Sequence, residues 1–204
     1  MSAVYSNAVT YRSNERLSLL PPRREYGRPL MSALWARRSS REYSPLPLEP
    51  QVMSDLLWAA YGVNRPDTGE RTAPFWRHRL VIDVFVAMAD GVWRYEPEAH
   101  ELTLRLSADI RAQTGTQDFV AEAPINLIYV AHGERMSEML SAERRLYASV
   151  DAAFIGQNVY LYCASEGLAT VFRGALDTEA LGKTLGLGYD QFVTFAQSVG
   201  YQRL

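Results

Sequence analysis

The sequence predicts an α+β domain with a mixed, mostly antiparallel central sheet flanked by helices. Three short β-rich runs follow one another between residues 80 and 106, separated by turn signals, which is typical of a meander. Longer helical patterns precede and follow them, and an almost uninterrupted apolar strand lies at 125–131. Helices and strands that alternate in this way around one sheet define the α+β class.

Composition limits the kinds of protein this can be. The 204 residues suffice for one core, and 48% hydrophobic with 22% charged residues is the balance of a soluble globular protein. A net charge of -2 argues against nucleic acid as a partner. We find no apolar run near the roughly 20 residues of a membrane span and no signal-peptide core at the N-terminus. We therefore expect a cytoplasmic protein without a membrane partner.

The first half of the chain divides into an arm and two helices. Residues 1–28 form a basic N-terminal arm, which is either a partly disordered tail or a strap over a partner subunit, and we expect one domain over 29–204. Pro29 favours a helix start, so a short helix is expected over 29–37. A second helix is expected to run to Tyr61 and to end at Gly62. The polar residues 64–74 predict a surface or ligand loop.

The strands and the later helices follow from periodicity. The meander is expected at 80–88, 92–95 and 101–106, with Asp90-Gly91 as its first turn. A helical stretch is predicted over 108–114. The long pattern from Glu134 to Gly167 is apolar around much of its circumference, with an expected break near Ser141 or Ser149. Such a helix is central or packs against a partner subunit. A strand at 169–173, a helix at 177–185 with Asp177 as N-cap, and a strand at 192–199 complete the set.

One stretch stands out chemically. Arg37, Arg38, Ser39 and Arg41 combine planar guanidinium donors with a small hydroxyl, a combination suited to phosphate oxygens. The simpler interpretation is a solvated basic helix end.

No metal site is predicted. The histidines His78, His100 and His132 lack any zinc-like spacing, and Cys163, the only cysteine, excludes an internal disulfide. We expect His100 and His132 at the surface and Cys163 buried. Asp151 and Glu166 are possible acids, each with a helix-surface explanation.

Four separated motifs, in order, resemble the nitroreductase superfamily of FMN-dependent oxidoreductases across residues 29–203, in particular its small bacterial members. They are Arg37-Arg38-Ser39-Ser40-Arg41, the helix and loop Leu56–Asn64, the segment Gly167–Gly174, and Val199–Arg203. The hairpin Trp93-Arg94-Tyr95-Glu96-Pro97 is similar to the family's Tyr-Asp-Pro-like hairpin.

The resemblance implies a flavin site, a reaction and an intertwined homodimer with its FMN sites at the interface. By position, Arg37, Arg38, Ser39 and Arg41 would contact FMN, Arg203 would return to the phosphate, and Arg173-Gly174 would offer a backbone N–H to the flavin N5. NAD(P)H would reduce FMN, which would pass electrons to a small organic acceptor such as a nitro or quinone compound. No catalytic side chain is required.

One motif departs from the family pattern. Where the family carries Pro-Ser-small-x-Asn, this chain has Pro74-Phe75-Trp76-Arg77-His78. Phe75 and Trp76 would line the substrate pocket, and His78 would take the asparagine's place at the flavin. The alternative hypothesis is a family member with an altered flavin pocket that serves as a binding or partner protein, or acts on a specialised metabolite.

Overall fold

The computed structural model describes residues 15–203 and has the predicted α+β architecture. Its main sheet has seven strands in the order β1-β6-β5-β4-β7-β9-β8, and every pairing in it is antiparallel. The strands are β1 (Arg16–Ser18), β4 (Ile82–Met88), β5 (Gly91–Glu96), β6 (Glu101–Leu106), β7 (Ile125–His132), β8 (Leu168–Arg173) and β9 (Gln191–Tyr201). A separate hairpin joins β2 (Val63–Arg65) to β3 (Glu70–Arg71).

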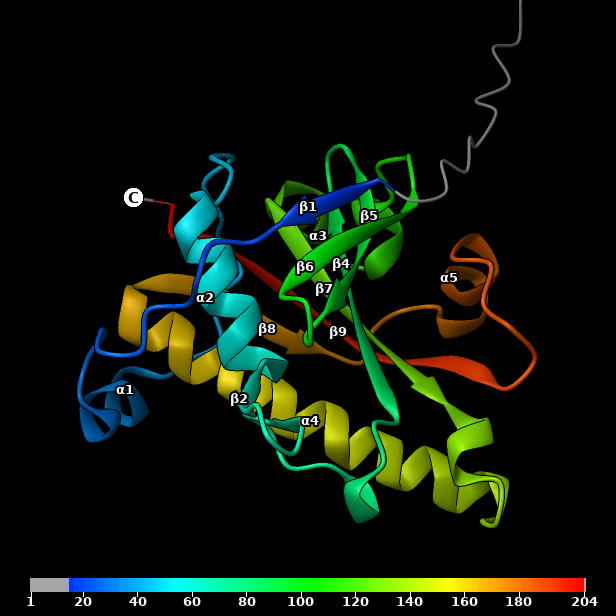
Figure 1. Ribbon diagram of the computed structural model, residues 1–204. Coiled ribbons are helices and arrows are strands. Elements are labelled where there is room, and N and C mark those ends of the chain that lie inside the picture. Colours follow the sequence, from blue (N-terminus) through cyan, green and yellow to red (C-terminus); the bar gives the residue numbers. More distant parts are fainter. Residues whose placement is uncertain (1–14, 204) are drawn as a thin grey trace, which may run out of the picture.

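Helices cover both faces of this sheet. They are α1 (Leu30–Ala36), α2 (Pro50–Tyr61), α3 (Phe119–Glu122), α4 (Ser141–Glu166) and α5 (Thr178–Thr184), with 3-10 turns η1 (Trp76–His78), η2 (Arg111–Thr114) and η3 (Gly133–Met136). The long α4 runs beneath the sheet with α2 beside it (Figure 1).

Strand β7 explains the continuous run of apolar residues at the centre of the sheet. All eight of its residues are buried. Leu127 and Tyr129 belong to the core shared with α2 and α4, whereas Ile128 and Val130 belong to the core shared with α5. Since neighbouring strand residues point to opposite faces, β7 serves two cores and has no solvent-facing side.

Most predicted elements are found, with shifts of a few residues. The meander, both early helices and β7 to β9 are present, and the Asp177 side chain accepts a hydrogen bond from Ala180 N–H at 2.9 Å, as expected of an N-cap. The break in the long helical pattern lies before Ser141, and the helix continues through Ser149. The stretch 108–114 yields only η2, and the predicted loop 64–74 contains the β2–β3 hairpin.

The described half of the basic arm packs on this chain itself. Strand β1 pairs with β6, and Arg23 forms an ion pair with the buried Asp55 of α2 at 2.7 Å. The Arg28 N–H donates to Ser165 Oγ near the end of α4 at 2.7 Å. Residues 15–28 are thus attached to the domain, while residues 1–14 lie outside the described residues.

The prediction of a surface position for His132 was wrong. Its ring is 5% exposed and lies 2.9 Å from Asp83 and 3.0 Å from Glu134. Burial alone lowers the pKa of His132, but the two carboxylates together outweigh it and raise the pKa above its usual value. His100 is half-buried, with Nε2 2.7 Å from Ser54 Oγ and Nδ1 2.8 Å from Tyr95 OH. Cys163 is buried, as expected.

Candidate functional site

The arginine segment, residues 37–41, is fixed across the ends of β8 and β9. Ser40 N–H donates to Thr170 O of β8 at 2.9 Å. Just beyond it, Tyr43 pairs with Gln202, and Ser44 N–H donates to Tyr201 O at 2.9 Å. The segment therefore lies beside the C-terminal tail because backbone hydrogen bonds hold it there.

Tyr43 anchors this arrangement from below. Its side chain is fully buried, and its hydroxyl donates to Ser40 O at 2.9 Å. Burial raises the pKa of Tyr43 far above its usual value, so the phenol keeps its proton. Gly200 is required at this contact, since a Cβ there would stand 2.5 Å from Pro124 and 3.1 Å from the Tyr43 ring.

The segment and the tail enclose an open cleft of about 450 Å³. Its walls are Arg38, Ser39, Ser40, Arg41, Glu42, Gln202 and Arg203. Arg203 forms an ion pair with Glu122 at 2.7 Å. Among residues 15–203, no carboxylate lies within ion-pair distance of Arg37, Arg38 or Arg41. The cleft therefore carries positive charge that the described part of the chain does not neutralise.

Tyr160 of α4 contacts the hydroxyl of Ser39. Ser39 Oγ lies 2.8 Å from Tyr160 OH, which accepts the Phe172 N–H at 2.9 Å. The Arg37 guanidinium lies over the Tyr160 ring, 5.2 Å from its centroid. Arg37 is thus drawn toward α4, whereas Arg38 and Arg41 are exposed.

The loop with Phe75, Trp76 and His78 has a strained backbone. Arg77 and His78 both adopt the left-handed backbone region, with φ of 44° and 56°, which is uncommon for residues other than glycine. The Trp76 ring has the guanidinium carbons of Arg77 and Arg79 at 5.1 and 5.6 Å from its centroid, and the Tyr147 ring at 5.8 Å. His78 is exposed, with Nδ1 3.5 Å from a Glu70 oxygen.

This loop and the arginine segment contact different parts of α4. Trp76 N–H donates to Asp151 Oδ2 at 2.9 Å, whereas the arginine segment meets Tyr160. Nine residues of helix separate these two contacts, or about 13–14 Å along the axis. One chain therefore does not bring Phe75, Trp76 and His78 together with Arg38, Ser39 and Arg41.

The side chain of Arg173 is buried and bonded within the protein. It is 4% exposed and donates to Thr114 O at 2.7 Å and to Asn126 Oδ1 at 3.0 Å. Burial lowers the pKa of Arg173 to about 10, which still leaves it protonated at neutral pH. Gly174 is exposed beside the Phe195 ring, so its backbone is accessible where the Arg173 guanidinium is not.

Sequence reasoning missed two contributors to these sites, Gln202 and Tyr160, and left the role of a third, Asp151, open. Gln202 lines the cleft and lies 3.5 Å from Arg38, and its place between Tyr201 and Arg203 in the C-terminal motif was an available signal. Tyr160 gave no signal, because it sits inside an apolar helical pattern. Asp151 was named as a possible acid with a helix-surface explanation; it is 3% exposed, and its carboxylate accepts the backbone N–H of Trp76 in η1.

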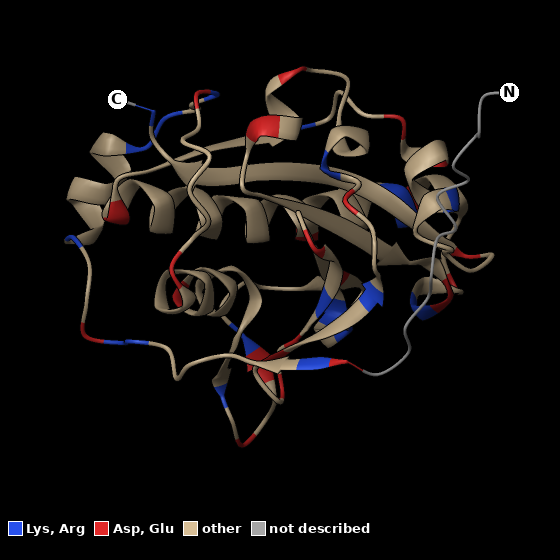
Figure 2. Cartoon of the chain, turned by 90° about the horizontal axis from the view of Figure 1, so that it is seen from above, with Lys and Arg blue, Asp and Glu red and all other residues tan. Residues whose placement is uncertain are grey.

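Two further classes of feature are not found in the described residues. No helix there is long and apolar enough to cross a membrane. No group of three or more His, Cys, Asp or Glu side chains within residues 15–203 is placed to hold a metal ion. Figure 2 shows basic and acidic residues interspersed along the described chain.

The fold and motifs match known proteins along most of the chain. Residues 34–201 match the model of the nitroreductase family. The Methanocaldococcus jannaschii protein MJ1384, which carries the name of a nitroreductase, is 34% identical over 156 residues, covering 72% of this chain and 78% of that one. A crystal structure from Ralstonia eutropha JMP134, described as a nitroreductase, superposes with a TM-score of 0.89 at 40% identity over 97% of both chains.

A more distant structure shares the fold alone. The NADPH:FMN oxidoreductase of Vibrio harveyi, complexed with NAD+, gives a TM-score of 0.64 at 18% identity over 86% of this chain and 69% of that one. Sheet, helices and motif order thus define a flavin-dependent class of oxidoreductase fold. The chain belongs to the nitroreductase family.

The buried Asp151 gives a prediction about the η1 loop. Burial raises the pKa of Asp151 to about 6, against the hydrogen bond from Trp76 that lowers it. An acid whose pKa is higher in the folded state than in the unfolded state destabilises the fold as the pH rises. The loss begins at the pKa of the unfolded state, about 3.9, and is complete above the pKa of the folded state. Asp151→Asn keeps an oxygen for Trp76 N–H but cannot ionise. We expect its unfolding midpoint to exceed the wild type's by a few degrees at pH 8 and to equal it near pH 4. A variant less stable than wild type at both pH values would contradict this.

Proposed function

We propose that this protein is an FMN-dependent oxidoreductase that takes electrons from NAD(P)H and passes them to a small organic acceptor, such as a nitro or quinone compound, in the cytoplasm. The observation that carries the proposal is the set of arginines without carboxylate partners, Arg37, Arg38 and Arg41, fixed at the family's phosphate motif. Three cations held within five residues repel one another, and an anion bound between them removes that repulsion. Family membership supports flavin chemistry in particular.

The residues of the cleft fit a flavin phosphate. Arg38 and Arg41 would donate to phosphate oxygens, with Arg203 across the cleft and Ser39 adding a directional hydroxyl. The Arg37 guanidinium, which lies over the Tyr160 ring, would add positive charge near Arg38 and Arg41. The exposed backbone of Gly174 is the candidate donor to the flavin N5. When bound, FMN supplies hydride acceptance and electron transfer, and the protein supplies position and charge.

A second copy of the chain would complete the site. The outer surfaces of α1 and α4 leave large apolar side chains exposed, namely Leu30, Met31, Trp35, Leu146, Val150 and Phe154. Exposed apolar surface of this kind marks an interaction face. In a two-fold dimer built on it, the η1 loop of one subunit would meet the arginine segment of the other. Phe75, Trp76 and His78 would then line the acceptor pocket above the ring.

Removing two arginines tests the phosphate site. In Arg38→Gln/Arg41→Gln, FMN should bind at least about a hundredfold more weakly, because each lost charge-assisted hydrogen bond is worth about 1.5–3 kcal/mol. Flavin fluorescence titration measures the affinity. The charge-matched control is Arg24→Gln/Arg105→Gln, which removes two exposed arginines elsewhere and should bind FMN like the wild type. Equal FMN affinity in the two double variants would overturn the assignment of the segment.

The second candidate function is that of a family member whose flavin pocket is altered by Phe75, Trp76 and His78 and that serves as a binding or partner protein, or acts on a specialised metabolite. The contacts of Trp76 favour it: the ring packs against Arg77, Arg79 and Tyr147 at the position where the family carries a small residue, and the backbone N–H of Trp76 donates to Asp151. A ring packed against three side chains loses those contacts if it swings aside to admit a ligand.

Phe75→Ser/Trp76→Ala separates the two functions. If the aromatics fill the flavin pocket, this variant should gain FMN affinity by about tenfold or more, since the two bulky side chains no longer compete with the ring. If they only line the acceptor pocket, FMN affinity should stay within a few-fold while KM for the acceptor changes. The same fluorescence titration, with steady-state kinetics on both proteins, distinguishes these outcomes. Unchanged FMN affinity sinks the second candidate.

A further inference from the structure

The Tyr160 hydroxyl joins the arginine segment to β8. Strand β8 is the last strand of the sheet, so one of its edges has no neighbouring strand. On that edge, Thr170 O accepts the Ser40 N–H at 2.9 Å. At the next position along the same edge, the Phe172 N–H donates to the Tyr160 oxygen at 2.9 Å. The Tyr160 hydroxyl therefore accepts a hydrogen bond where the carbonyl of a further strand would otherwise do so.

This contact decides where the Tyr160 proton points. A phenol hydroxyl has one proton to donate, and its oxygen can also accept. Ser39 Oγ lies 2.8 Å from the Tyr160 oxygen, and either hydroxyl could donate across that distance. If Ser39 donated, the Tyr160 oxygen would accept two hydrogen bonds, and its own proton would have no other acceptor among residues 15–203. If Tyr160 donates, each of its groups is used once, which is the favoured arrangement for a half-buried hydroxyl.

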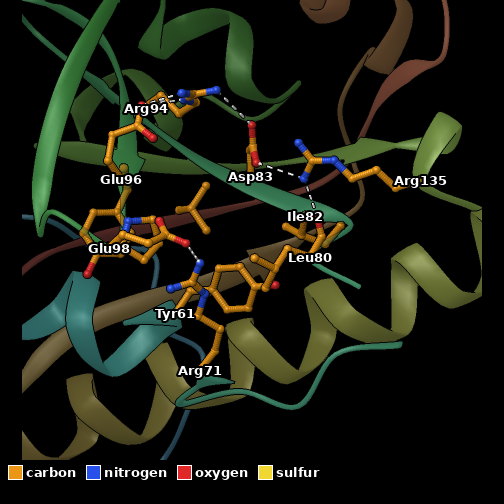
Figure 3. A pocket seen from close by; sticks show the side chains of 12 residues that line it. Tyr61, Arg71, Leu80, Ile82, Asp83, Arg94, Glu96, Glu98 and Arg135 are labelled. Carbon is orange, nitrogen blue, oxygen red and sulfur yellow. Dashed lines mark hydrogen bonds and ion pairs between the residues drawn. The ribbon is translucent and has the colours of Figure 1, made fainter. Parts of the chain in front are cut away.

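A second cavity shows how the chain satisfies arginines that do not face this cleft. The Arg71–Tyr61 cavity, of about 200 Å³, lies between α2, the β2–β3 hairpin and strands β4 and β5. Each of its three arginines forms an ion pair within the chain, and Figure 3 shows the pairs Arg71–Glu98, Arg94–Glu96 and Arg135–Asp83. The cleft at the arginine segment differs, because Arg38 and Arg41 have no such partner among the described residues.

A Ser39 hydroxyl that accepts from Tyr160 keeps its own proton for the cleft. Ser39 is exposed there, beside Arg38 and Arg41. Phosphate oxygens are strong acceptors, so a hydroxyl that turns its proton toward them attracts them, whereas one that presents only lone pairs repels them. Resting on the proposed function, we propose that Tyr160 is a positioning residue of the flavin site, which fixes the Ser39 hydroxyl as a hydrogen-bond donor to the FMN phosphate.

Comparison of FMN with riboflavin tests this role, because riboflavin lacks the phosphate. Flavin fluorescence titration of the purified full-length protein gives both dissociation constants. Tyr160→Phe removes the hydroxyl but keeps the aromatic face beneath the Arg37 guanidinium. It should weaken FMN binding about three- to tenfold, the usual effect of losing one neutral hydrogen bond. Ser39→Ala removes the donor itself and should weaken FMN binding about ten- to a hundredfold. Riboflavin affinity should stay within about twofold of the wild type's in both variants.

The double variant tests whether Tyr160 acts through Ser39. In the Ser39→Ala background, Tyr160→Phe should change the FMN Kd by less than about twofold, because the hydroxyl that it positions is gone. The matched control is Tyr162→Phe in the same helix, since the Tyr162 hydroxyl donates to Val52 O of α2 at 3.2 Å and not to the arginine segment. Both tyrosine variants should unfold earlier than the wild type, but Tyr162→Phe should keep the wild-type FMN Kd.

The contrary results are distinct. Tighter FMN binding by Tyr160→Phe would mean that Ser39 donates to Tyr160 and that the variant frees its proton for the phosphate. Unchanged FMN binding, equal weakening of FMN and riboflavin, or additive losses in the double variant would each overturn the positioning role while leaving the proposed function intact. A wild-type protein that binds no FMN would overturn the proposed function and this inference with it.

Discussion

The backbone hydrogen bonds that tie the arginine segment to β8 and the C-terminal tail are the constraint on which the proposed site depends. They bring Arg38, Arg41 and Arg203 to one cleft, and of these only Arg203 has an acidic partner in the described chain. Like charges at such a place raise the energy of the ligand-free protein. Other arginines, such as Arg65 and Arg144, lie against carboxylates. The contrast supports the proposal that the segment binds an anion from outside the chain.

Helix α4 contacts both the arginine segment and the η1 loop, at positions well separated along its axis. Tyr160 contacts the Ser39 hydroxyl, while Asp151, nine residues earlier in α4, accepts the backbone N–H of Trp76 in the η1 loop. The strain at Arg77 and His78 is maintained by that anchor and by the contacts of Trp76. This loop is distant from the arginines of its own chain, and in the proposed dimer it would act on the second copy. The apolar outer faces of α1 and α4 provide the surface on which the two copies would meet.

Local patterns predicted much of the fold and part of the site. The apolar run of β7, the hairpin between β4 and β5 and the Asp177 cap depend on neighbours in sequence, and these predictions are confirmed. The hairpin turn lies one residue earlier than predicted, at Ala89-Asp90, and Gly91 begins β5. Contacts between distant residues were not predictable. His132 is buried because Asp83, 49 residues away, supplies its partner. The Arg71–Tyr61 cavity combines a helix end with a hairpin that was expected to be a loop. For the arginine segment, the order of four motifs in the sequence pointed to the residues. Their arrangement around one cleft could be seen only in the structure.

The visible spectrum of the purified protein, reconstituted with FMN, tests the central claim most directly. An FMN-dependent oxidoreductase should retain the yellow flavin absorbance through gel filtration, and anaerobic NAD(P)H should bleach it. Adding a nitro or quinone acceptor should then restore the flavin absorbance. A protein that elutes colourless after incubation with FMN would contradict the account, whatever its fold.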